Sequence, residues 1–129
     1  MRIKKGYLIA AFVILVLIVV GSIGFTAIAK KLESFGHIDF STLDLSTIED
    51  GTYNGSADGG IVKVSVEVTV KDHVLRSISL VSHDNGKGKP AEVIVQRIVE
   101  QNSLEVDAIS GATHSSNIIK AAVLDALTK

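Results

Sequence analysis

The stretch from residue 107 to residue 116 holds the side chains of this sequence that best suit chemistry. Its acidic, small and hydroxyl-bearing residues are Asp107, Ser110, Gly111, Ala112, Thr113, Ser115 and Ser116. Small residues let backbone N–H groups approach a ligand closely, and the start of a helix adds about half a positive charge, so this turn suits an anion such as phosphate. Thr113 offers a hydroxyl at the same point. Serine and threonine also cap helices, so spacing alone leaves both interpretations open.

An acid, a histidine and a serine in this stretch, Asp107, His114 and Ser115, raise the question of a hydrolase. His114 and Ser115 are sequence neighbours, so nothing places the imidazole to take a proton from the serine hydroxyl. The G-x-S-x-G sequence of a nucleophile elbow is also missing. A hydrolase is therefore set aside.

The absence of cysteine limits the cofactors that the chain can use. It excludes disulfides, iron–sulfur ligation, thiolate zinc sites and a CxxCH haem attachment, so any redox chemistry must use an organic cofactor. The four histidines show no HxxxH or HExxH spacing, so a zinc site is not expected.

The elements that position this turn begin with a predicted β-hairpin. Valines alternate strictly with polar residues from residue 62 to residue 70, which is typical of a half-buried strand. A second strand is expected at residues 74–82, with Ile78 and Leu80 on the buried face. Residues 71–73 form the turn between the two strands.

Two helices are expected after the hairpin. Pro90 can open the first, because its missing N–H costs nothing at a first helical position. The apolar residues of this helix recur at helical spacing and are Ala91, Ile94, Val95, Ile98 and Val99. Residues 104–106 are expected to form a short strand.

The last helix is expected to open with Ser115 or Ser116 as its N-cap. Its single apolar stripe is Ile119, Ala122, Val123, Ala126 and Leu127. The predicted fold is therefore α+β, a small antiparallel sheet covered by two helices.

An uncharged run at residues 7–29 precedes the fold and predicts a transmembrane helix. Twenty-three helical residues span roughly 34 Å, enough for a hydrocarbon core of about 30 Å. Residues 1–29 are therefore interpreted as a membrane anchor. A cleaved signal peptide is the alternative, because residues 27–29 read Ala-Ile-Ala, although the apolar run exceeds the usual h-region.

The charges around this run predict its orientation and argue about partners. Arg2, Lys4 and Lys5 precede the run, which favours a cytoplasmic amino terminus and a single-pass protein with its carboxyl-terminal domain outside the cytoplasm, at the cell membrane. After residue 29 there are fourteen acidic and ten basic residues, a net charge of −4. This acidic balance argues against nucleic-acid binding.

Residues 30–48 mix polar and scattered apolar residues and are interpreted as a linker, with room for a short helix, to a folded domain at residues 49–129. As a flexible coil, a linker of about 18 residues would reach roughly 20–25 Å, which keeps the domain close to the membrane.

The stretch at residues 107–113 resembles the flavinylation motif of the FMN-binding domain family, Asp-x-x-Ser/Thr-Gly-Ala-Thr. The family includes subunits of sodium-translocating NADH:quinone reductase and of Rnf electron-transport complexes. Asp107, Ser110, Gly111, Ala112 and Thr113 match the motif position by position. The similarity continues from Asp50 to the final helix, about the last eighty residues.

The resemblance implies that FMN is held covalently. In the family a flavin transferase uses FAD and Mg²⁺ to place FMN on the last threonine of the motif as a phosphoester, which here is Thr113. The implied function is an electron carrier that serves redox partner proteins or a membrane electron-transport complex, and not a self-sufficient enzyme. Ser115 and Tyr53 join the expected FMN site, Tyr53 either stacking on the ring or belonging to the core.

The sequence departs from the family pattern in two places. The hairpin turn reads Asp72-His73 where the family often has Asp-Gly, and the loop after the second strand is short. Lys87 and Lys89 in that loop either lie near the flavin or form a solvated basic loop. Two other functions stay open: a module that binds FMN without a covalent bond, and a scaffold domain without cofactor.

Overall fold

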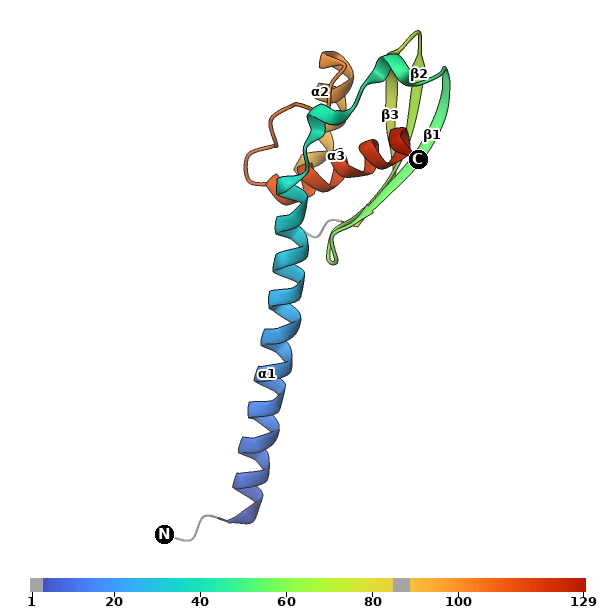
Figure 1. Ribbon diagram of the computed structural model, residues 1–129. Helices are drawn as coiled ribbons and strands as arrows, with labels where there is room; N and C mark the ends of the chain where they lie inside the picture. The colour runs from blue at the N-terminus through green and yellow to red at the C-terminus, as the bar shows by residue number, and fades with distance from the viewer. Residues whose placement is uncertain (1–3, 85–88) are drawn as a thin grey trace.

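The chain begins with a 30-residue helix, α1 (Lys5–Ser34), that projects away from the other elements (Figure 1). The structure is a computed structural model that describes residues 4–84 and 89–129. Apolar side chains of α1 from Tyr7 to Phe25 are exposed along its length. Within the described residues, α1 is the one helix long and apolar enough to cross a membrane. The helix predicted at residues 7–29 is present, and it begins two residues earlier and ends five residues later than expected.

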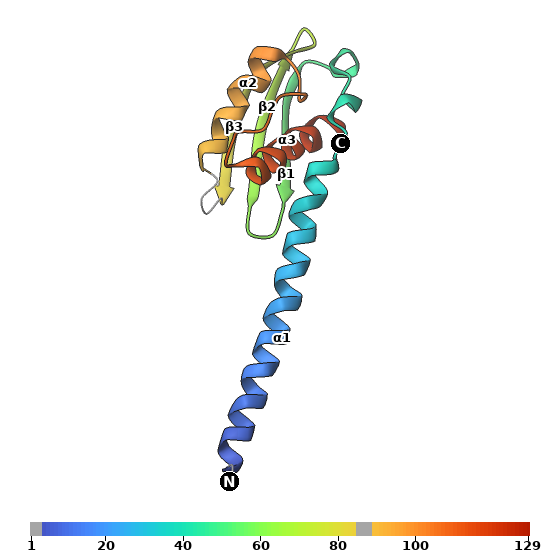
Figure 2. The same ribbon diagram turned by 90° about the vertical axis from the view of Figure 1, so that its left-hand side faces the viewer.

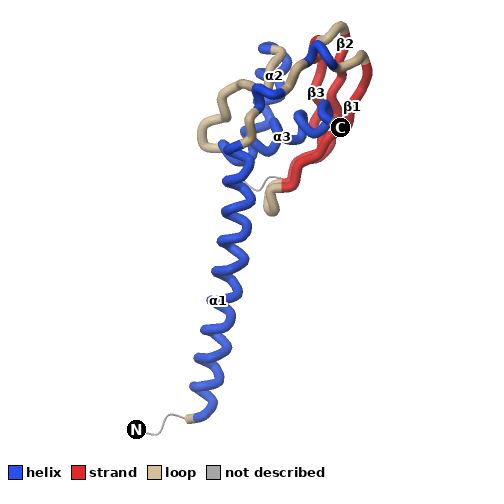
Figure 3. Tube along the Cα trace, viewed as in Figure 1, coloured by secondary structure: helices blue, strands red, loops and turns tan. Residues whose placement is uncertain are grey.

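A three-stranded antiparallel sheet forms one layer of the fold, with the strands in chain order. Its strands are β1 (Gly51–Asp58), β2 (Lys63–Lys71) and β3 (Val74–Asp84). Helices α2 (Ile94–Gln101) and α3 (Thr113–Thr128) lie on one face of this sheet (Figures 2 and 3). The α+β prediction is confirmed.

The predicted hairpin between β2 and β3 is confirmed, and its turn explains the unusual histidine. Asp72 and His73 both have positive φ angles, 54° and 59°, which a two-residue type I′ turn requires. His73 gains a specific role there, since its Nδ1 lies 3.2 Å and 3.1 Å from the carbonyl oxygens of Leu45 and Ile48. The His73 side chain therefore connects the segment at residues 45–48 to the hairpin.

An irregularity in the β2–β3 pairing explains why Leu75 faces the core. Thr69 pairs with Ser77 and Val70 with Leu75, so Arg76 is an extra residue in β3. A β-bulge of this kind shifts the alternation by one position. Leu75 is therefore buried, while the predicted residues Ile78 and Leu80 pack against the core from partly buried positions.

The apolar stripe predicted after Pro90 faces the core, although the first turn is a 3-10 helix. That turn spans Lys89–Val93 and leads directly into α2. Ala91, Ile94 and Ile98 are completely buried.

The expected strand at residues 104–106 is wrong, because these residues are coil. Side chains satisfy their backbone groups in place of a neighbouring strand. The Glu105 N–H donates to the Ser103 hydroxyl at 3.0 Å, and the Val106 carbonyl accepts from the Lys120 ammonium at 3.0 Å.

The last helix starts earlier than predicted and is buried on more than one side. Its first residue is Thr113, so neither Ser115 nor Ser116 is the N-cap. The predicted stripe is buried as expected, but Ile118 and Ala121 are buried as well. The expectation of a single stripe is therefore wrong, because α3 also carries contacts away from the sheet.

The segment that follows α1 makes some of these additional contacts with α3. It folds into three 3-10 turns, Phe35–His37, Phe40–Thr42 and Leu45–Thr47. Asp39 and Asp44 cap the last two turns by accepting N–H groups at 3.0 Å and 2.9 Å. Phe40, Leu43 and Leu45 pack against the core. The helical structure that the linker prediction allowed is present as these three turns, whereas the segment packs against the domain and is not a flexible coil.

Candidate functional site

The stretch that carries the motif residues forms a tight turn before α3. The Ala112 N–H donates to the Ile109 carbonyl at 2.9 Å, which closes a four-residue turn. Gly111 has a φ angle of 79°, as the third residue of a type II turn requires. Glycine adopts this conformation without the strain of a Cβ atom.

Ser116 holds this turn closed from inside the helix. Its hydroxyl accepts the Ile109 N–H at 2.9 Å and donates to the Ala112 carbonyl at 2.8 Å. The Ser116 side chain is completely buried. The residue expected to cap the helix therefore links both ends of the turn.

Burial divides the four hydroxyl residues of the stretch into two pairs. Ser110 and Thr113 are exposed, whereas Ser115 and Ser116 are 4% and 0% exposed. An enzyme acting on the folded turn reaches the first pair only.

The amino terminus of α3 is open to an anion. Among the described residues, Ala112 at the N-cap position makes no side-chain capping hydrogen bond. The first turn reads Thr-His-Ser-Ser, without an acidic residue. Its first backbone N–H groups have no partner within the helix, and together with the helix dipole they favour a negative group at Thr113.

Lys120 supports the turn from two helical turns further along α3, and sequence reasoning missed it. Its ammonium donates to the Val106 carbonyl at 3.0 Å and lies 4.2 Å from the centroid of the Phe40 ring. Burial lowers the pKa of Lys120, while the nearby carboxylates of Asp107 and Glu105 oppose that shift. Lys120 follows Thr113 by seven residues, which places the two residues on one face of α3. This spacing is the sequence feature that could have identified Lys120.

An apolar groove of about 310 Å³ lies beside the turn. Its lining residues are Phe25, Ile28, Ala29, Leu32, Ile61 and His114. The first four belong to α1, Ile61 to the loop between β1 and β2, and His114 follows Thr113 in α3.

Residues 59–128 match the model of the FMN-binding domain family, which is more than half of the chain. The chain belongs to the FMN-binding domain family. The matched domain is therefore an electron-carrier module that binds FMN, as the resemblance of the motif implies. The match covers β2, β3, α2 and α3 and leaves α1 and β1 outside.

The motif residues of the FMN-binding domain fit the cofactor that its family implies. The exposed Thr113 lies at an uncapped helix start, where a phosphate would find N–H donors and a favourable dipole. Asp107, Ser110 and Gly111 are exposed around the same turn. Ala112 is 8% exposed and contributes its backbone to the turn.

Tyr53 lies away from this turn. Its hydroxyl donates to the Glu49 carbonyl at 2.8 Å, and its ring packs against the core near the carboxyl end of α3, beside Leu127. This position favours the core interpretation of Tyr53 over stacking on a flavin at Thr113. The side chains of Lys87 and Lys89 fall outside the described part of the structure.

Proposed function

We propose that this protein is a membrane-anchored electron carrier outside the cytoplasm, with FMN held covalently at Thr113. The observation that carries the proposal is the exposed threonine hydroxyl at the uncapped start of α3, inside a family-matched domain. Ser110 is the competing acceptor by exposure.

The attachment reaction uses a flavin transferase with FAD and Mg²⁺ as partners. The Thr113 hydroxyl oxygen forms a new P–O bond to the FMN half of FAD, its proton leaves, and the anhydride bond breaks to release AMP. The backbone N–H groups at the start of α3 stabilise the phosphoester anion that results. The buried hydroxyl of Ser116 keeps the turn in shape and takes no part in bond formation.

FMN supplies the electron transfer, and the protein positions and shields the flavin. A redox partner protein or a membrane electron-transport complex delivers and accepts the electrons. A covalent bond suits a site outside the cytoplasm, because a site of ordinary affinity empties when free flavin falls below its dissociation constant.

The deciding experiment is incubation of the purified chain with flavin transferase, FAD and Mg²⁺. We expect one FMN, less water, in the mass of the intact chain, and flavin fluorescence that stays with the denatured polypeptide. Colour that is lost on denaturation would identify a module that binds FMN without a covalent bond. A colourless product would point to a scaffold domain without cofactor.

The orientation of α1 gives a second prediction, and the lack of cysteine makes it easy to test. Ser79 is exposed on β3, and Lys4 precedes α1. In intact cells a membrane-impermeant maleimide should label Ser79→Cys, whereas Lys4→Cys should react only after the membrane is permeabilised. The reverse labelling pattern would mean that the domain faces the cytoplasm.

A further inference from the structure

We propose that the apolar groove beside α1 binds the isoalloxazine ring of the FMN carried by Thr113. The groove is the one lined by Phe25, Ile28, Ala29, Leu32, Ile61 and His114. This inference rests on the proposed function and adds the surface against which the flavin ring packs.

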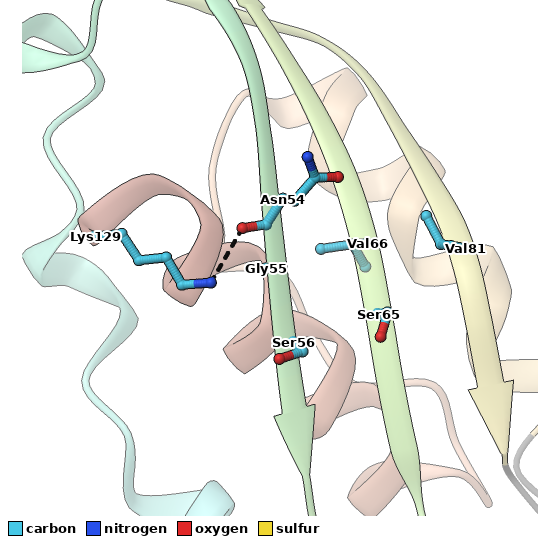
Figure 4. A pocket seen from close by; sticks show the side chains of 7 residues that line it. All are labelled: Asn54, Gly55, Ser56, Ser65, Val66, Val81 and Lys129. Carbon is cyan, nitrogen blue, oxygen red and sulfur yellow. Dashed lines mark hydrogen bonds between the residues drawn. The ribbon is translucent and has the colours of Figure 1, made fainter.

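Among the hollows described in the structure, this groove is the one that lies next to Thr113. His114 lines it and is the residue next to Thr113. A hollow of about 230 Å³, shown in Figure 4, includes Asn54 and Lys129, and another of about 350 Å³ includes Tyr53 and Lys129. Both therefore involve the carboxyl end of α3, about 24 Å from its start at 1.5 Å per residue.

Contacts between α1 and the β1–β2 loop join the two walls of the groove. The ammonium of Lys31 lies 3.4 Å from the carboxylate of Asp58. The same Asp58 oxygen accepts the Gly60 N–H at 2.7 Å, and this hydrogen bond, followed by Lys31 and Lys63, lowers the pKa of Asp58. The loop that carries Ile61 is therefore held against α1 (Figure 1).

Close packing at two glycines brings the loop this near to the helix. A Cβ atom on Gly59 would lie 3.1 Å from Leu32 Cδ2 and would collide with the Ile118 side chain. Gly60 has a φ angle of 97° and faces Ile28. The groove is thus shaped by these small residues on one side and by one face of α1 on the other.

The chemistry of the lining suits a flat aromatic ring. Five of the six lining side chains are apolar, and Phe25 and His114 are aromatic rings that can pack against another ring. A volume of about 310 Å³ lies at the lower end of the range of roughly 300–1,000 Å³ for small-molecule sites. Ile61, in the loop outside α1, is 64% exposed, so covering it with the flavin would remove apolar surface from water.

The proposal assigns a role to a segment that lies outside the matched domain. The family match begins at residue 59, whereas four of the six lining residues come from α1. Phe25, Ile28 and Ala29 lie at the end of the uncharged run, directly before Lys30 and Lys31. With α1 as the anchor, the flavin ring would lie at the membrane surface.

The test compares two alanines of α1 in the flavinylated full-length chain. Ala29 lines the groove, and Ala27, two residues away, lies about 200° around the helix and does not line it. Covalent FMN is first verified by mass in each protein, and ring exposure is then measured as quenching of flavin fluorescence by iodide in detergent. We expect Ala29→Phe to displace the ring and to raise the quenching constant at least twofold, with Ala27→Phe matching the native chain.

A second pair tests the opposite wall without changing α1. Ile61 and Val81 are both loop or bulge positions and are 64% and 66% exposed, so either tolerates serine. Ile61→Ser should raise the quenching constant and Val81→Ser should not. Equal quenching in all five proteins, or native quenching equal to that of free FMN, would overturn the groove proposal. A chain without covalent FMN would instead overturn the proposed function.

Discussion

Replacing Thr113 with valine should give a folded domain that gains no covalent FMN. Valine keeps the shape of threonine and removes the hydroxyl oxygen through which residue 113 would form the phosphoester. Thr113 is exposed at the start of α3, so the substitution leaves the core unchanged. We expect the flavin fluorescence of the denatured chain to fall to background after incubation with transferase, FAD and Mg²⁺.

Two matched variants separate the acceptor from its neighbours. Thr113→Ser restores a hydroxyl at the same position and should regain part of the modification. Ser110→Ala removes the other exposed hydroxyl of the turn and should leave the flavin on the chain. If Thr113→Val still carries FMN after denaturation while Ser110→Ala does not, then Ser110 is the acceptor.

The hairpin could be predicted from the sequence because its signals are local. Alternating valines define the buried face of β2, and the dipeptide Asp72-His73 provides the two positive φ angles of the turn. The same reasoning could not locate the bulge at Arg76, because a bulge depends on pairing between two strands.

The segment after α1 was mistaken for a flexible coil because its stabilising contacts come from distant residues. Its carbonyl groups meet the imidazole of His73, which follows them by 28 and 25 positions. Phe40 meets the ammonium of Lys120, eighty positions later in the chain. Composition alone contains none of this information.

The motif identifies the candidate site, and burial distinguishes among its hydroxyl residues. The motif selected Thr113, but the start of α3 was predicted too late, since serine at 115 or 116 is as good a cap as any residue before it. Only the structure separates Ser115 and Ser116, both buried, from the exposed hydroxyls. The groove was not predictable, because it joins residues near positions 28, 61 and 114.

The contact between α3 and β1 predicts the largest effect on stability, at Gly55. A Cβ atom on Gly55 would collide with the Ala122 carbonyl and the Ala126 N–H and would lie 2.7 Å from Ala126 Cβ. The carbonyl and amide groups belong to the backbone of α3, so they cannot turn away as a side chain does. Polar contacts on both sides hold the helix there: the Ser56 N–H donates to Asp125 at 2.9 Å, and Lys129 donates to the Asn54 carbonyl at 3.3 Å (Figure 4).

We therefore expect Gly55→Ala to lower the free energy of unfolding by about 3 kcal/mol, at the upper end of overpacking costs. For a domain of this size that corresponds to a fall in Tm of roughly 12–24 °C, measured by circular dichroism on the full chain. Gly111→Ala is the control, because Gly111 has a positive φ angle of 79° but open space around its Cα. Its cost is conformational strain alone, about 1 kcal/mol. Equal melting of the two variants would show that α3 can move away from β1, and that the Gly55 contact does not fix the helix whose first residue is Thr113.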